Sequence, residues 1–163
     1  MNLEIKKLTS PYILMLVGPP LVGKSSFIKK YCSDIDVISR DEILMEVSES
    51  RNYSEAWKKV DQKKVDRLLI QRLNESNKEK RNVIIDMTNL TVKSRVSKLN
   101  LFSKDYFKVA FIFPVLSNEE FERRNEERKI NENKFIPIFV IKNMINSYEV
   151  PTSKEGFDKI VRI

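Results

Sequence analysis

Short apolar runs alternate with segments of helical periodicity along the whole chain. Strands that alternate with helices are typical of βαβ units, so this pattern predicts an α/β fold with a parallel sheet of about five strands flanked by helices. Each run is short and rich in β-branched or aromatic residues, as strands covered on both faces require. The predicted strands are Ile13 to Val17, Val37 to Ser39, Val83 to Asp86, Val109 to Phe113 and Lys159 to Ile163.

Apolar spacing and end signals predict the helices between these strands. One long amphipathic helix is expected from about Ser54 to Asn74, with Ser54 as its cap. Thr91 is the expected cap of a later helix, and Pro137 begins the last one, whose apolar face returns the chain to the core. We expect the long helix to bury a stripe made of Trp57, Val60, Val65, Leu68, Leu69 and Leu73.

The segment from Asn118 to Asn133 is dominated by Glu, Arg, Lys and Asn. Ser117 and Glu120 form a capping-box pattern that predicts a helix here. Only Phe121 and Ile130 are apolar, so we expect no face of this helix to be deeply buried. The composition predicts a solvated or mobile element.

Length and composition limit the chemistry that the chain can perform. Its 163 residues fit one domain, residues 1–163, and 41% are hydrophobic, as in a globular protein. Cys32 is the only cysteine, which excludes an intramolecular disulfide, and there is no histidine. Acid-base catalysis must therefore depend on carboxylates.

The net charge of +7 fits either a polyanionic partner or simple solubility. The longest apolar runs are far too short to cross a bilayer, and the N-terminus lacks the apolar core of a secretory signal. We therefore expect no membrane association and a cytoplasmic location, which is the host cytoplasm if a phage encodes the chain. The sequence leaves the oligomeric state open.

The first apolar run is followed by a match to the phosphate-binding pattern G-x-x-x-x-G-K-[ST]. Such a loop wraps its N–H groups around an oxyanion, and the next helix, here predicted from Ser25 to Tyr31, adds its positive end. Lys24 would reach the β- and γ-phosphates of ATP, and Ser25 would hold Mg²⁺. The alternative is an ordinary glycine-rich turn. The expected nucleotide contacts are Gly18, Pro19, Pro20, Leu21, Val22, Gly23, Lys24, Ser25 and Ser26.

Two strand ends deliver carboxylates to the edge where open α/β sheets bind ligands. Asp41, after the second strand and beside Arg40, is the candidate general base for a hydroxyl that attacks the γ-phosphorus. The alternative is that Asp41 caps the next helix. Asp86 ends the third strand as a Walker B carboxylate does, so it is a candidate Mg²⁺ ligand. Thr88 and Asn89 either contact the substrate or form a turn.

Arg124 and Arg128 are four residues apart, so on a helix they project from one face and can clamp phosphate oxygens. The alternative is a solvated face held by ion pairs. Because the segment lies between the fourth strand and the last helix, we predict an arginine lid at about residues 118–136. Asp34 and Asp36 match an aspartyl phosphatase pattern, but they precede a strand instead of following one, and we interpret this match as chance.

With these residues the chain resembles the polynucleotide 5′-hydroxyl kinase family over nearly its whole length. The resemblance implies a P-loop kinase fold that uses ATP and Mg²⁺. It implies that Asp41 activates the 5′-hydroxyl, that Arg128 contacts the transferring phosphate and that Arg124 belongs to the lid. It rests on the phosphate loop, Ile38-Ser39-Arg40-Asp41, Asp86-Met87-Thr88-Asn89, Phe113-Pro114 and Arg124-Asn125-Glu126-Glu127-Arg128.

Two features depart from the family pattern. The family usually carries an arginine three residues after the catalytic Asp, where it grips the phosphate of the attacked nucleotide, and this chain has Leu44 there. The family enzymes also often carry a phosphatase or ligase domain, which a chain of this length cannot include. We therefore expect the kinase module alone.

Three functions follow from these residues. The principal hypothesis is an ATP-dependent kinase acting on the 5′-hydroxyl ends of DNA or RNA. The second is a related kinase acting on a hydroxymethylated base in DNA or on a small-molecule hydroxyl, which Leu44 favours. The third is a nucleotide-binding module without turnover, which would need neither Asp41 nor the paired arginines.

Overall fold

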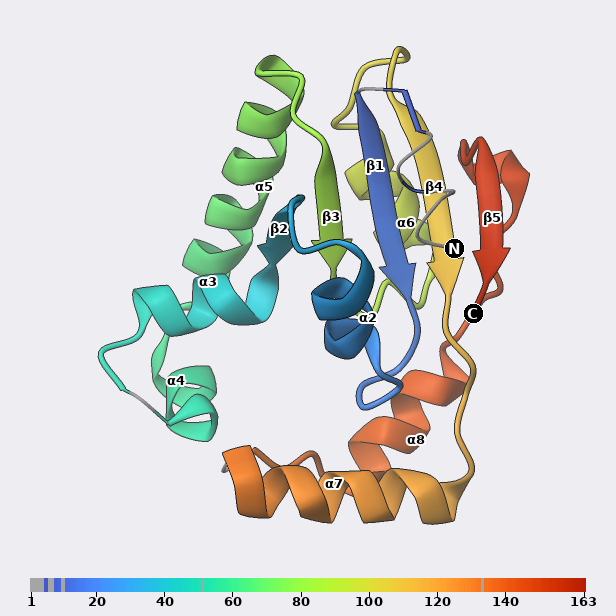
Figure 1. Ribbon diagram of the computed structural model, residues 1–163. Helices are drawn as coiled ribbons and strands as arrows, with labels where there is room; N and C mark the ends of the chain where they lie inside the picture. The colour runs from blue at the N-terminus through green and yellow to red at the C-terminus, as the bar shows by residue number, and fades with distance from the viewer. Residues whose placement is uncertain (1–4, 6–7, 10, 51, 133) are drawn as a thin grey trace.

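The computed structural model describes residues 5, 8–9, 11–50, 52–132 and 134–163. In this part of the chain five parallel strands form one sheet in the order β2-β3-β1-β4-β5 (Figure 1). The predicted α/β fold with five parallel strands is confirmed. Where the observed strand ends differ from the predicted ones, they differ by one or two residues. The strands are β1 (Tyr12–Val17), β2 (Asp36–Ser39), β3 (Val83–Asp86), β4 (Phe107–Ile112) and β5 (Lys159–Arg162).

Helices cover both faces of the sheet (Figure 1). Helices α3, α5 and α6 pack on one face, and α2, α7 and α8 contribute to the core on the other. Among the described residues no helix combines the length and apolarity needed to traverse a bilayer. The helices are α2 (Lys24–Tyr31), α3 (Arg40–Val47), α4 (Tyr53–Lys59), α5 (Gln62–Lys78), α6 (Val92–Leu99), α7 (Asn118–Glu132), α8 (Ile138–Asn146) and the 3₁₀ turn η1 (Ser153–Glu155).

The central strand β1 shows why the sheet needs both layers. All of its residues are buried. Ile13, Met15 and Val17 join the core under α3 and α5, whereas Leu14 and Leu16 join the core under α2. Alternate side chains of a strand point to opposite faces, so a continuous apolar run can be buried only between two layers of helices.

The long helix predicted from Ser54 to Asn74 is wrong, because the chain forms two helices there. Asn52 caps α4 by accepting a hydrogen bond from the Glu55 amide (3.1 Å), and Asp61 caps α5 by accepting one from the Lys63 amide (2.9 Å). Between them the backbone is extended at Val60. Asp61 therefore starts a new helix by satisfying an amide that has no partner within the first turn.

The break also changes the position of Trp57, which we expected in the core. Its side chain is 47% exposed, so that expectation is wrong. The guanidinium of Arg40 lies over the indole, 5.1 Å from the ring centroid. The apolar stripe continues only in α5, where Val65, Leu69 and Leu73 are buried.

Helix α7 is more firmly attached than its composition predicts. Phe121 is fully buried within the α2-side core, and Asn125 is also buried. The Asn125 amide donates to the carbonyl of Ile136 (2.7 Å) and accepts from the Ile136 amide (3.1 Å). The expectation that no face is deeply buried is therefore wrong for these two residues, because one aromatic ring and one bidentate amide are enough to anchor a polar helix.

Candidate active site

The carboxyl ends of β1, β2 and β3 lie side by side at one edge of the sheet. Asp86 is in register with Leu16 of β1 and with Ser39 of β2. The amide of Gly18 donates to the carbonyl of Thr88 (3.0 Å), which ties the start of the phosphate loop to the turn after β3. This register brings the residues that follow all three strands to one place, as expected for a ligand site in a parallel sheet.

The two glycines of the phosphate loop are needed for different reasons. Gly23 has φ +95°, a left-handed conformation that L side chains rarely adopt, and α2 begins at the next residue. Gly18 has an ordinary φ, but a methyl group there would lie 3.0 Å from Phe113 Cβ and 3.2 Å from Val22 Cγ2. One glycine thus permits the turn into the helix, and the other permits close packing against β4.

Lys24, at the start of α2, points back into the loop. Its ammonium donates to the carbonyls of Gly18 (3.0 Å) and Pro19 (2.6 Å). Burial lowers the pKa of Lys24 to about 8, although the carboxylates of Asp86 and Asp41 counter part of this effect and Arg128 adds to it. All three side chains are therefore close enough to act on the charge of Lys24.

Asp86 and Ser25 are the two residues that we predicted to hold a divalent cation. Asp86 ends β3, and burial raises its pKa, with opposition from the charge of Lys24 and support from Asp41 and Glu42. Ser25 is the second residue of α2 and is exposed. A hydroxyl and a carboxylate supply hard oxygen donors, so this donor set fits Mg²⁺ shared with phosphate oxygens.

Asp41 is held by a tyrosine that sequence reasoning missed. Ser39 is the N-cap of α3 and Asp41 lies within the first turn, so the alternative that Asp41 is the cap is wrong. The Tyr53 hydroxyl donates to Asp41 Oδ1 at 2.8 Å. Burial, the Asp41 charge and this hydrogen bond all raise the pKa of Tyr53, so the phenol remains a donor. Tyr53 lies on α4, and only the packing of α4 beside α3 reveals its role.

The arginines of α7 divide into two groups. Arg124 donates to the Leu21 carbonyl in the phosphate loop (2.9 Å) and pairs with Glu120 (2.6 Å). Arg128 pairs with Glu132 (3.3 Å). Its charge adds to the lowering of the pKa of Lys24 and opposes the rise in the pKa of Tyr53. In contrast, Arg123 is exposed and pairs with Glu120 and Glu127. Figure 1 shows α7 lying across this edge of the sheet and ending near α4.

Arg40 points away from the phosphate loop, toward α5. It donates to Asp66 Oδ1 (2.8 Å) and to Gln62 Oε1 (2.8 Å) while it covers Trp57. Its Nη1 atom is buried and has no hydrogen-bond partner among the described residues. The structure therefore places this predicted substrate contact beside the site, in contact with an exposed aromatic ring.

The side chain of Asn89, for which we expected either a substrate contact or a role in a turn, is buried. Its amide donates to the carbonyl of Leu16 (2.8 Å), and its φ is +48°. Asparagine is among the few residues that tolerate this conformation, so the turn interpretation holds. Thr88 is partly exposed, and its carbonyl accepts the Gly18 amide.

A buried ion pair is bonded to the backbone of the turn after β3. Arg95 on α6 is fully buried and pairs with Glu155 through Nε–Oε2 (2.6 Å) and Nη2–Oε1 (2.9 Å). Its Nη1 donates to the carbonyls of Asn89 (3.0 Å) and Leu90 (2.9 Å). Burial alone would raise the pKa of Glu155, but hydrogen bonds from Arg95 and from the Thr152 backbone hold it below the ordinary value.

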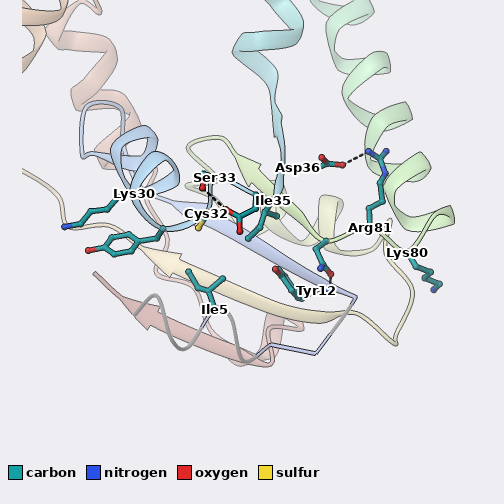
Figure 2. A pocket seen from close by; sticks show the side chains of 12 residues that line it. Ile5, Tyr12, Lys30, Cys32, Ser33, Ile35, Asp36, Lys80 and Arg81 are labelled. Carbon is teal, nitrogen blue, oxygen red and sulfur yellow. Dashed lines mark hydrogen bonds and ion pairs between the residues drawn. The ribbon is translucent and has the colours of Figure 1, made fainter.

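A hollow of about 510 Å³ lies at the opposite, amino edge of the sheet (Figure 2). Asp36 begins β2 here and pairs with Arg81 (2.6 Å), while the Ser33 hydroxyl donates to Asp34 (2.6 Å). Asp34 precedes β2 and Asp36 is its first residue, so neither follows a strand, in agreement with our interpretation of the phosphatase pattern as chance. This hollow is separated from the phosphate loop by the length of the strands.

A family model described as an AAA domain matches residues 13–151. Because this match covers most of the chain, the chain belongs to that family, whose members are P-loop kinase-like domains. The family and the sheet confirm the predicted P-loop kinase fold. The fold implies that the chain binds a nucleotide.

Three solved structures illustrate the range of similar proteins. A chain of the Pnkp1/Rnl/Hen1 RNA repair complex is 25% identical, with a TM-score of 0.67, over 95% of this chain and 49% of that chain. Kti12 from Chaetomium thermophilum in complex with ADP-AlF3 is 15% identical, with a TM-score of 0.62, over 93% and 88%. A gluconokinase from Sinorhizobium meliloti 1021 is 14% identical, with a TM-score of 0.56, over 96% and 83%.

The last two likenesses concern the fold alone. This chain spans about half the length of the RNA repair chain that it matches. The relatives thus agree on a P-loop kinase-like domain and differ in what they act on.

Proposed function

We propose that this protein is an ATP- and Mg²⁺-dependent kinase that transfers the γ-phosphoryl group to a 5′-hydroxyl end of DNA or RNA. The observation that carries the proposal is the position of Asp41: its charge acts on Lys24, and its carboxylate is oriented by the Tyr53 hydroxyl. The similarity to a chain of an RNA repair complex supports a nucleic-acid acceptor, as does the net charge of +7.

In this proposal the phosphate loop and Lys24 hold the triphosphate, and the acceptor hydroxyl faces Asp41. The hydroxyl oxygen forms a bond to the γ-phosphorus, the bond from that phosphorus to the β,γ-bridging oxygen breaks, and ADP leaves. The hydroxyl proton passes to Asp41 Oδ2, because Tyr53 already occupies Oδ1. Carboxylate catalysis is required because the chain has no histidine.

Positive charge is supplied from two sides of the transferring group. Lys24 acts from the loop, and Arg124 and Arg128 act from α7, which serves as the lid in this proposal. Ser25 and Asp86 would hold Mg²⁺, which neutralises charge on the phosphate oxygens when bound. On binding ATP, Lys24 would exchange two loop carbonyls for phosphate oxygens.

The test is a panel of acceptors incubated with γ-labelled ATP. Single-stranded DNA and RNA with 5′-hydroxyl ends, a nicked duplex, hydroxymethylated DNA blocked at its 5′ ends, nucleosides and gluconate are compared under one condition. We expect label on the 5′-hydroxyl ends and none with Asp41→Asn. Label on another hydroxyl only would overturn the acceptor and leave the kinase class intact.

A second candidate function is phosphorylation of a hydroxymethylated base or of a small molecule. It is favoured by Leu44, which is fully buried in the core. A buried leucine cannot replace the phosphate-gripping arginine that the resemblance implies at this position. Transfer to the blocked hydroxymethylated DNA or to gluconate in the same panel would select this function.

A further inference from the structure

Trp57 has no role in the phosphoryl transfer described above, yet it contacts Arg40, the neighbour of Asp41 in the chain, and lies beside Tyr53, which bonds to Asp41. We propose that the exposed indole of Trp57 is the stacking platform for the terminal base of the nucleic-acid acceptor. This inference rests on the proposed 5′-hydroxyl kinase function and adds the residue that would recognise the acceptor end.

The first support is the geometry of α4. Tyr53 and Trp57 are one helical turn apart, with ring centroids 6.3 Å apart and an interplanar angle of 31°. The Tyr53 hydroxyl bonds to the candidate base, so the same short helix links Asp41 to Trp57. A 5′-terminal nucleotide whose hydroxyl faces Asp41 would therefore place its base within reach of the indole.

The second support is the state of the Trp57 ring. The side chain is 47% exposed, although aromatic side chains usually bury most of their surface. Arg40 covers one face of the indole and is itself fixed by Asp66 and Gln62. Arg40 thus backs the indole, and the exposed part of the ring is the surface that a base would contact in this proposal. Base stacking on aromatic rings tolerates any sequence, which suits an enzyme that acts on strand ends.

The third support is the positive charge around these rings. The Lys134 ammonium lies 5.5 Å from the centroid of the Tyr53 ring, and Arg128 acts on the Tyr53 hydroxyl. Lys134 is in the connection between α7 and α8, so the lid side of the site also faces α4 (Figure 1). Aromatic rings flanked by cations are the usual composition of a surface for single-stranded nucleic acid. In this proposal Lys134 supplies the cation for an acceptor phosphate that the buried Leu44 cannot supply.

The test uses the fact that Trp57 is the only tryptophan in the chain. Tryptophan emission, excited at a wavelength that the five tyrosines do not absorb, therefore reports this site. Binding of a dye-labelled 5′-hydroxyl DNA of about ten nucleotides is followed by anisotropy, and tryptophan emission is followed with the same DNA without the dye. We expect quenching that saturates at the DNA concentration at which anisotropy saturates, and much weaker quenching when the 5′-terminal nucleotide is abasic.

The matched control moves the fluorophore. Ile70 on α5 is 48% exposed, almost the same as Trp57, so the double variant Trp57→Phe, Ile70→Trp keeps one exposed tryptophan at another place. We expect DNA to leave the emission of this variant unchanged. Equal quenching in both proteins would show a nonspecific effect and overturn the proposal.

Kinetics separate a stacking role from a structural one. Trp57→Ala should raise the KM for the DNA acceptor about tenfold or more, because stacking on one ring stabilises a bound base substantially, and should leave the KM for ATP unchanged. Trp57→Phe should restore most of the loss. Equal KM values for DNA in Trp57→Ala and the parent would overturn the proposal while 5′ labelling still occurs. Absence of any 5′ labelling in the parent would instead overturn the proposed function.

Discussion

Two clusters of cations and carboxylates in the described part of the chain differ in how fully their charges are paired. At the pair of Arg95 and Glu155, one carboxylate faces one guanidinium, and two backbone carbonyls satisfy the remaining nitrogen. At the carboxyl edge of the sheet, the hydrogen bonds of Lys24 within the described residues go to carbonyls of its own loop, while Asp86 and Asp41 act on its charge and Arg128 opposes them.

The comparison distinguishes a structural cluster from a binding cluster. A buried charge that is fully paired contributes to the fold and has no capacity left for a ligand. Burial instead lowers the pKa of Lys24, and a bound polyanion would favour the charged form of this ammonium. Predictions follow for both clusters.

The largest expected effect comes from Asp41→Asn. A carboxamide retains the shape and can still accept from Tyr53, but it cannot take the proton, so turnover should fall by up to about ten-thousandfold. Affinity for a fluorescent ATP analogue and the melting temperature should remain as in the parent. A parallel loss of nucleotide affinity would assign Asp41 to the binding cluster itself and contradict a role as base.

Arg128→Ala should lower turnover by about a thousandfold, as loss of an arginine finger does elsewhere. Arg123→Ala is the matched control on the same helix, since Arg123 is exposed and paired with Glu120 and Glu127. We expect the control to stay within about twofold of the parent. Single-turnover rates at saturating ATP measure both, and similar losses in the two variants would contradict the division of α7 into two groups of arginines.

Arg95→Ala tests the structural cluster. Removing the guanidinium leaves Glu155 buried and unpaired, which should cost about 3–5 kcal/mol of unfolding free energy in urea titrations. Arg81→Ala breaks an exposed pair with Asp36 and should cost less than about 1 kcal/mol. At a temperature where Arg95→Ala remains folded, ATP affinity should change little. A selective loss of ATP affinity without a loss of stability would show that the two clusters are not separate.

The smallest effect is a pH dependence of ATP binding. Because the pKa of Lys24 is lowered to about 8 and bound phosphates would raise it again, the protein must take up a proton to bind ATP once the pH exceeds about 8. Affinity should therefore fall as pH rises, by about fivefold between pH 8 and pH 9. Calorimetry in buffers of different ionisation enthalpy should detect the uptake, and Lys24→Arg, which stays charged, should abolish it.

The sequence predicted the parts of the fold and the site that depend on local pattern. The strand runs, the Thr91 cap and the positions of Lys24, Asp41 and Asp86 after their strands all follow from spacing. Tyr53 could not be predicted, because its bond to Asp41 requires α4 to pack beside α3. The exposure of Trp57 was not predicted either, because we assumed one continuous helix. The Asp61 cap interrupts the helical period that had placed the indole in the core.

The close approach between Gly18 and Phe113 joins the phosphate loop to the segment that leads to α7. The Phe113 amide donates to the carbonyl of Val17, and a methyl group on Gly18 would lie 3.0 Å from Phe113 Cβ. Phe113 follows β4 and precedes the connection to α7. One added carbon at position 18 would therefore disturb the start of that connection together with the loop, so the tolerance of this position is set by two elements at once.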